Sequence, residues 1–328
     1  MATDNVLEIK NLHTYFYTDG GVIKAVDGVD VELRRGATLG IVGESGSGKS
    51  VTSLSVMGLL TGTKGKIADG EILLDGDDIV KLTKEQQRKL RGSKISMIFQ
   101  EPMTSLNPVM KIGDQVAECV LQHEKISKKE ALKKAEDMLR KTGVPRVEHM
   151  MKEYPFQLSG GQRQRVMIAM ALVCKPEILI ADEPVSALDV SIQAQILNLM
   201  QDLQDNLGLT YLFITHDLSV VKYISDDILV MYLGQMVEKA PSDKLFKHPM
   251  HPYTQALLSA IPIPDPKVPM NRITMKGEIT SPINPEKGCR FAKRCPYATD
   301  ACRQQDMVLT EQEPGHFVTC LRVQRGEI

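Results

Sequence analysis

The sequence has almost no net charge, since 40 Lys and Arg residues balance 41 Asp and Glu residues and leave a formal charge of −1. A chain with this balance has no overall attraction to nucleic acid or to anionic lipid. No uncharged apolar stretch approaches the roughly 18 residues that a membrane-spanning helix requires. The opening residues, MATDNVLEIK, lack the basic start and apolar run of a secretory signal. We therefore expect a soluble, cytosolic protein that meets a membrane only through a partner.

Cysteine pairs at the two-to-four-residue spacing typical of zinc sites are also absent. Cys119 and Cys174 stand alone and are expected to be small buried hydrophobic residues. The other four cysteines follow the spacing C-x5-C-x6-C-x17-C in a proline-rich tail. This tail is too small to form a hydrophobic core of its own, so the four thiolates suggest a metal site that stabilises it. An iron–sulfur cluster tolerates wide spacing better than zinc does, so cluster, zinc ion and free thiols or incidental disulfides stay open. These four residues are Cys289, Cys295, Cys302 and Cys320.

Short apolar runs that end in glycine or in a polar residue recur along the chain. Such runs suit strands buried on both faces of a mainly parallel sheet, and helix-like stretches at 50–60 and 191–208 separate several of them. An α/β fold is therefore predicted, with 6–17 and 25–36 forming an antiparallel pair beside the sheet. The expected strands of the mainly parallel sheet are 37–43, 70–76, 94–100, 177–183, 210–216 and 227–234.

The residue pattern changes twice along the 328 residues of the chain. Between about 100 and 160 the pattern is helical, and in 126–144 the apolar residues fall on one face while lysines cover the other. Beyond residue 240 the chain holds 11 of its 17 prolines, which resist long helices and central strands. We therefore predict a main domain at 1–240, with a helical subdomain at about 100–160, and a loop-rich extension at 241–328. His316 is expected to be a solvated loop residue.

Residues 43–50 read GESGSGKS and fit the pattern G-x-x-x-x-G-K-[ST] between a strand-like and a helix-like run. Glycines let the backbone curl so that its N–H groups face phosphates at the N-terminus of a helix, whose dipole favours negative charge. The lysine of the pattern reaches the β- and γ-phosphates, and the following serine ligates Mg²⁺. The sequence thus predicts a nucleotide site formed by Gly43, Ser45, Gly46, Gly48, Lys49, Ser50 and Val51.

Two further strand ends carry residues suited to phosphate chemistry. In EILIADE, Asp182 is predicted to hold Mg²⁺ and Glu183 to polarise the attacking water. His216 ends the run TYLFITH, at the sheet edge where ligands of open α/β folds bind, and is predicted to contact the γ-phosphate.

The order GESGSGKS, Gln100, LSGGQ, ILIADE, SALD and His216 resembles the ATP-binding subunit of an ABC transporter, over roughly residues 5 to 265. The resemblance implies a P-loop ATPase cassette in which two subunits pair head to tail. Each ATP is then clamped between the phosphate loop of one subunit and the serine–glycine–glycine signature of the other. The residues implied to contact the partner's ATP are Ser159, Gly160, Gly161 and Gln162.

The same resemblance assigns three more positions. Gln100 is implied to touch Mg²⁺ and the attacking water, and Asp189 to cross the dimer interface toward the opposite site. Phe16 is implied to stack on adenine, with Tyr17 and Tyr15 as alternatives. The sequence departs from the family at Val185, where threonine or serine is commoner, and we expect little consequence because no catalytic group changes.

The stretches IFQEPMTSLNP (98–108) and HPYTQALLSAIP (251–262) are similar to the ATPases of dipeptide and oligopeptide importers and of their nickel-importing relatives. This similarity implies a second, homologous ATPase subunit, two membrane-embedded permease subunits and an external binding protein. The ATPase would lie at the cytoplasmic face of the membrane, with Mg²⁺ and ATP bound and a [4Fe-4S] cluster, or alternatively zinc, on the four clustered cysteines. The cargo stays open between dipeptide, longer peptide and nickel, with sugar oligomers as a minor fourth.

Two rival functions come from other classes. A soluble ABC ATPase acting on nucleic acid is disfavoured because the chain has one cassette and no basic stripe that would follow a phosphate backbone. A non-hydrolysing ATP sensor is disfavoured because Glu183 and His216 are both present.

Overall fold

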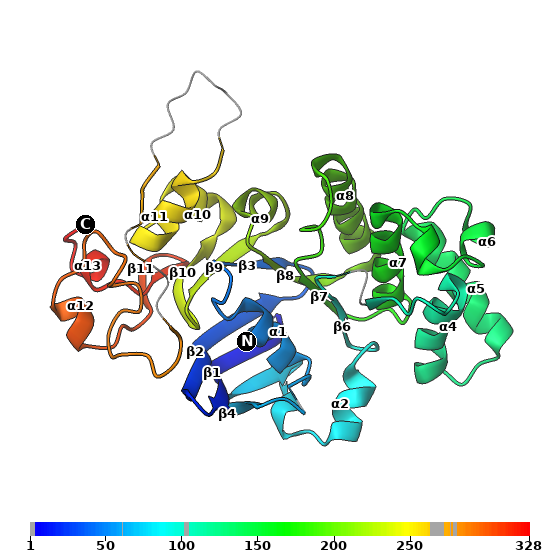
Figure 1. The fold of residues 1–328 in the computed structure, drawn as a ribbon, viewed down its shortest axis with the longest axis horizontal. Helices are drawn as coiled ribbons and strands as arrows, with labels where there is room; N and C mark the ends of the chain where they lie inside the picture. Colours follow the sequence, from blue (N-terminus) through cyan, green and yellow to red (C-terminus); the bar gives the residue numbers. More distant parts are fainter. Residues whose placement is uncertain (1–3, 61, 102–104, 263–271, 276, 278–280) are drawn as a thin grey trace. The chain divides into compact units, whose positions relative to one another are not determined.

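The structure, a computed structural model, describes residues 4–60, 62–101, 105–262, 272–275, 277 and 281–328. The chain folds into two compact units (Figure 1). Unit 1 comprises Met1–Leu33, Thr38–Val80 and Thr215–Ile328, and unit 2 comprises Arg34–Ala37 and Lys81–Ile214.

Unit 1 contains a four-stranded sheet in the order β2-β1-β4-β5. Consecutive neighbouring strands joined by only Asp19 and Gly20 must be antiparallel, so the pair predicted at 6–17 and 25–36 is confirmed. The four strands are β1 (Asn5–Thr18), β2 (Gly21–Arg34), β4 (Gly65–Leu74) and β5 (Asp77–Asp78).

The assignment of 70–76 to the mainly parallel sheet is wrong. This segment belongs to β4, which pairs antiparallel with β1 and places Ile72 opposite Ile9. Its last residues alternate, with Ile72 and Leu74 buried and Leu73 half-buried. One buried face is typical of an antiparallel sheet, and the apolar run GEILLDG concealed that alternation.

Five further strands of unit 1 are hydrogen-bonded in the order β11-β12-β10-β9-β3. β3 is buried along its whole length and pairs parallel with β9, whereas β9 and β10 form an antiparallel hairpin. β12, from the far end of the chain, pairs antiparallel with β10. The strands are β3 (Thr38–Val42), β9 (Asp227–Tyr232), β10 (Gln235–Pro241), β11 (Thr310–Glu313) and β12 (His316–Val318).

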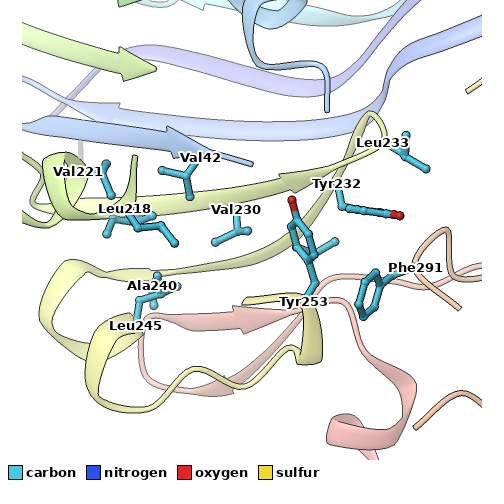
Figure 2. Close-up of a cluster of buried hydrophobic side chains, with 12 residues drawn as sticks. Val42, Leu218, Val221, Val230, Tyr232, Leu233, Ala240, Leu245, Tyr253 and Phe291 are labelled. Atoms are coloured by element: carbon cyan, nitrogen blue, oxygen red, sulfur yellow. The ribbon is translucent and has the colours of Figure 1, made fainter. Parts of the chain in front are cut away.

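The hydrophobic core of these strands includes residues from both sides of position 240 (Figure 2). Val42 and Val230 come from the strands, Tyr253 from α11, and Phe291 from the cysteine-bearing segment. The proline-rich extension therefore folds onto the cassette rather than around a core of its own. The helices of unit 1 are α1 (Lys49–Val56), η1 (Ile79–Lys81), α9 (Leu218–Ile224), α10 (Ser242–Lys247), α11 (Pro252–Ser259), α12 (Ala301–Gln304) and α13 (Leu321–Gln324).

Unit 2 contains three parallel strands in the order β8-β7-β6, as predicted for these segments. They are β6 (Ile95–Ile98), β7 (Ile178–Asp182) and β8 (Thr210–Thr215), and every residue in them is buried. Strands covered on both faces need a largely apolar sequence, which these three have.

The helices of unit 2 include a group formed by α4, α5, α6 and α7, drawn in green in Figure 1. In α5, Ser127 and Glu130 form a capping box, and Ala131, Ala135 and Leu139 are fully buried. The predicted apolar face of 126–144 is confirmed by this burial. The helices are α2 (Lys84–Leu90), α4 (Ile112–His123), α5 (Lys128–Lys141), α6 (Val147–Met150), η2 (Pro155–Gln157), α7 (Gly160–Leu172) and α8 (Val190–Leu207).

Among the described helices, none is both long enough and apolar enough to cross a lipid bilayer.

Candidate functional site

The predicted phosphate loop is the turn between β3 and α1. Gly43, Gly46 and Gly48 all have positive φ, at 154°, 77° and 103°. A Cβ atom on Gly43 would lie 2.2 Å from the carbonyl oxygen of Met231, and one on Gly48 would lie 2.3 Å from that of Ala25. These two positions therefore require glycine for two reasons, since the backbone is left-handed and a neighbouring strand leaves no room.

Lys49 is nearly fully buried in the first turn of α1, next to Ser50. Its ammonium donates hydrogen bonds to the carbonyl oxygens of Gly43, at 2.8 Å, and Glu44, at 3.0 Å. The loop thus holds its one lysine against its own backbone. Ser50 and Val51 follow in the same turn and are half-buried, while Ser45 is exposed.

Glu183 and Gln100, both predicted to be catalytic, are brought together in unit 2. The amide nitrogen Nε2 of Gln100 donates to Oε2 of Glu183 at 3.0 Å. Asp182 ends β7 and is buried, whereas Gln100 is exposed and Glu183 half-buried. A carboxylate held by one amide and still reached by solvent can accept a proton from water.

The backbone of Glu183 is unusual because its φ is 48°. Its N–H donates to the carbonyl oxygen of Ile214 at 2.8 Å, and its own carbonyl accepts from Ser186. Non-glycine residues rarely occupy this left-handed region, and such residues cluster at functional sites. No feature of the run EILIADE signals this conformation.

The signature residues 159–162 form the start of α7. The hydroxyl of Ser159 accepts from the N–H of Gln162 at 3.3 Å, and the side chain of Gln162 accepts from the N–H of Ser159 at 2.9 Å. Ser159 and Gly160 are exposed, so the positive end of the helix is accessible. A Cβ atom on Gly161 would lie 2.8 Å from Cγ2 of Ile192, which gives this glycine a packing role that sequence reasoning missed.

Asp189 and His216 lie just outside regular elements. The carboxylate of Asp189 accepts from the N–H of Ile192 at 3.0 Å and caps α8, and Asp189 is exposed. His216 follows β8 and is exposed. The phosphate loop and His216 belong to unit 1, whereas Gln100, the signature, Asp189 and the Asp182–Glu183 pair belong to unit 2.

The three candidate adenine-stacking aromatics lie at the end of β1. The hydroxyl of Tyr15 donates to Asp27 at 2.5 Å. Burial, and to a smaller extent this hydrogen bond, raises the pKa of Tyr15. Phe16 is half-buried with its ring against Gly65, and Tyr17 is 49% exposed. Which ring meets a nucleotide stays a prediction.

Two family models match separate parts of the chain. Residues 26–186 match the ABC transporter family, and residues 237–302 match the C-terminal region of oligopeptide/dipeptide transporters. The oligopeptide transport ATP-binding protein AppD of Bacillus subtilis (strain 168) is 51% identical over 316 residues, covering 96% of each chain. The chain belongs to the ATP-binding subunits of the oligopeptide/dipeptide ABC transporter family.

Other members and structures of the wider family agree with this assignment. The dipeptide transport ATP-binding protein DppD of the same Bacillus strain is 45% identical over 99% of this chain and 97% of its own. A solved dimer of an ATP-binding cassette in a post-hydrolysis state, bound to ADP and Pi, is 30% identical. It has a TM-score of 0.64 and covers 72% of this chain and 98% of that one. The predicted α/β P-loop cassette and the ATPase class are therefore confirmed, and such an ATPase uses Mg²⁺ with its ATP.

The part of this ABC subunit that matches the peptide-transporter C-terminal region contributes three residues to a buried polar network. Glu238 of β10 is fully buried and accepts from the N–H groups of Met250 and His251, at 2.7 and 3.0 Å. Nε2 of His316 lies 2.7 Å from the same carboxylate. His316 is 0% exposed, so its assignment as a solvated loop residue is wrong. The proline-rich context suggested a loop, but the residue begins β12.

The four clustered cysteines of the ABC subunit line one small apolar cavity of about 20 Å³. Burial raises the pKa of the Cys289 thiol to about 12 and also raises the pKa values of Cys295 and Cys320. Within the described ranges, no group of three or more His, Cys, Asp or Glu side chains is arranged to hold a metal ion. The cysteines suit a metal in chemical type but not in arrangement, so the predicted [4Fe-4S] cluster, or zinc, finds no support here.

Cys119 and Cys174 lie together in unit 2, where the thiol of Cys174 is 3.4 Å from the carbonyl oxygen of Cys119. Both residues are half-buried rather than fully buried. Burial raises the pKa of Cys174 to about 11, so it is a poor nucleophile at neutral pH.

Proposed function

We propose that this subunit hydrolyses ATP to drive the uptake of dipeptides or oligopeptides across the cytoplasmic membrane. The observation that carries the proposal is the near-complete correspondence with peptide-transport subunits, which includes the C-terminal region. The similar proteins named above are named for peptides, which favours peptide over nickel as the cargo.

The catalytic roles follow from the chemistry of the side chains. Glu183 polarises the attacking water, and Gln100 holds the Glu183 carboxylate in place through its amide. Ser50, Asp182 and Gln100 are the residues that would hold Mg²⁺, which supplies charge neutralisation at the phosphates. Lys49 and His216 would stabilise the negative charge that develops on the γ-phosphoryl group.

The subunit would act in a head-to-tail pair with a second, homologous ATPase subunit. The exposed capping box at Ser159 leaves the N-terminus of a 13-residue helix accessible, and such a terminus favours a bound anion. Ser159, Gly160, Gly161 and Gln162 would therefore contact ATP held on the phosphate loop of the partner. Asp189, exposed at the neighbouring helix start, would lie at that interface.

Two permease subunits would anchor the ATPase pair to the cytoplasmic face of the membrane, and an external binding protein would deliver the peptide. A groove of about 320 Å³ in unit 2, lined by Met97, Phe99, Met167 and Met170 among others, supports a docking role. Phe99 is 43% exposed and directly precedes Gln100. Methionine-rich apolar surfaces adapt well to a protein partner.

Transport by the assembled complex in proteoliposomes tests the cargo. ATP inside the vesicles, with binding protein outside and permeases in the membrane, should drive uptake of a labelled dipeptide or oligopeptide and not of Ni²⁺. A complex carrying Glu183→Gln is the matched control and should take up neither. Uptake of Ni²⁺ without peptide would overturn the peptide assignment.

The cysteines are a separate part of the proposal. A [4Fe-4S] cluster, with zinc as the alternative, stays a prediction for Cys289, Cys295, Cys302 and Cys320, which share one cavity but are not arranged to hold a metal ion in the described part of the chain. Iron, sulfide and zinc analysis of anaerobically purified protein, with its visible absorbance, tests this. Metal-free protein in which all six cysteine thiols titrate would rule out both.

A further inference from the structure

One residue of the phosphate loop is paired with the C-terminal region. The guanidinium of Arg294 donates to Glu44 through both terminal nitrogens, Nη1 to Oε2 at 2.6 Å and Nη2 to Oε1 at 3.1 Å. Arg294 is 8% exposed, although it comes from the cysteine-bearing segment 250 residues farther along the chain. A bidentate arginine–carboxylate ion pair fixes the orientation of the carboxylate as well as its distance from the guanidinium.

A second contact holds the backbone of the same residue. The N–H of Glu44 donates to the hydroxyl of Tyr253 at 2.9 Å. Tyr253 is fully buried, with its ring centroid 4.7 Å from that of Tyr232 and 5.4 Å from that of Phe291 (Figure 2). The hydroxyl is therefore held by a ring that is buried in an aromatic cluster.

The position of Glu44 matters for the lysine of the loop. Lys49 donates to the carbonyl oxygen of Glu44, so the residue that Arg294 and Tyr253 hold is also one of the residues that orient Lys49. The carboxylate of Glu44 adds a negative charge to a loop that would receive a triphosphate. Pairing with Arg294 cancels that charge where it would otherwise repel the ligand.

We propose that Arg294 and Tyr253 are positioning residues for the phosphate loop, so that the affinity of this subunit for ATP depends on its C-terminal region. Arg294 neutralises Glu44, and Tyr253 fixes its backbone. The inference rests on the proposed role of residues 43–50 and of Lys49 in binding ATP.

Binding of a fluorescent ATP analogue to the full-length subunit, together with KM and kcat of the assembled transporter, tests the pairing. Arg294→Gln should weaken nucleotide binding and raise KM by about tenfold, the loss expected for one charge-assisted pair, with a smaller change in kcat. Adding Glu44→Gln to that variant should restore the affinity to within about threefold of the wild type, because the unpaired carboxylate is gone.

Further variants separate charge from packing. Arg294→Lys keeps the charge and should fall between wild type and Arg294→Gln. Tyr253→Phe keeps the ring and should raise KM a few-fold, a loss that Glu44→Gln does not recover. Arg322, which pairs with Glu327 in the same C-terminal region, supplies the control, and Arg322→Gln should leave ATP affinity unchanged.

Lys49→Ala tests the phosphate site itself, independently of the effect of Arg294 and Tyr253 on that site. If it leaves ATP binding intact, the proposed phosphate site fails and this inference fails with it. If it abolishes binding while Arg294→Gln does not weaken it, only the inference is overturned. A loss in Arg294→Gln that Glu44→Gln leaves unrepaired would also overturn it, because a merely structural role predicts no rescue.

Discussion

Glu183 is the proposed general base, and its backbone has a left-handed conformation that only a few per cent of non-glycine residues adopt. The conformation costs of order 1–3 kcal/mol and persists only where surrounding contacts impose it. Here they include the bond from its N–H to Ile214, the bond from Ser186 to its carbonyl and the bond from Gln100 to its carboxylate. The side chain is thus aimed by its backbone before any ligand arrives.

Glu183→Gln should lower kcat by about 10²–10⁴-fold while ATP binding stays at the wild-type level, because the amide cannot accept a proton from water. Steady-state phosphate release and binding of an ATP analogue measure the two quantities. Glutamine has the same length and the same backbone preferences, so the melting temperature should not fall. Undiminished turnover would remove Glu183 from the role of base.

The roles of single residues were the least predictable part of the site. GESGSGKS identified the residues of the phosphate loop, but nothing in it indicated that Glu44 pairs with Arg294, because the two lie 250 residues apart. Burial of His316 was missed for the same reason, since its partner Glu238 lies 78 residues away. Contacts of this kind depend on tertiary packing and leave no local pattern.

At the scale of the element, α8 shows how a predicted interface residue can also be structural. Asp189 caps this 18-residue helix, and Gly208 ends it with a φ of 66°. The helix-like segment 191–208 agrees with the observed helix to within one residue at each end. Asp189 before the helix and Gly208 after it are ordinary boundary signals. The strand 65–74 was predicted less well, because its short apolar run does not distinguish parallel from antiparallel pairing.

Asp189→Ala should lower the free energy of unfolding by about 1 kcal/mol, because it removes the acceptor for the N–H of Ile192. Urea unfolding measures this loss, and equal stability of the alanine variant would rule out the cap. Asp189→Asn is the matched control, since asparagine caps a helix equally well. If Asp189→Asn keeps the wild-type stability but lowers the ATPase rate of the assembled pair, the carboxylate has a second role at the interface.

At the scale of the whole molecule, residues of the C-terminal region and of the cassette are buried in the same core. Glu238, His251 and His316 join β10, the start of α11 and β12, and all three side chains are essentially inaccessible to solvent. Burial lowers the pKa of His251 to about 4, and its Nδ1 accepts from the N–H of Tyr253 at 3.0 Å. The folded protein therefore requires this imidazole to be neutral.

Acid should weaken the protein between about pH 6.5 and pH 4. An unfolded histidine binds a proton below about 6.5, whereas the folded His251 does so only below about 4, so acidification favours the unfolded chain. The contribution of neutral His251 to the free energy of unfolding is fully present above pH 6.5. Roughly 3 kcal/mol of stability is lost as the pH falls from 6.5 to 4. Melting temperatures measured from pH 7 to pH 4 test this.

His251→Asn provides the comparison, since its amide oxygen can still accept from the N–H of Tyr253 but does not titrate. This variant should lose less stability on acidification than the wild type does. Equal acid sensitivity of the two proteins would show that other groups account for it.

The pairing of β12 with β10 has a consequence for how the protein is made. During synthesis β10 leaves the ribosome about 80 residues before its neighbour, counting from Pro241 to Val318. Until then β10 has an open edge, which can pair with strands of other nascent chains. A prematurely terminated chain that lacks β12 would keep that edge and should be prone to aggregate, so correct folding of β10 depends on synthesis reaching β12.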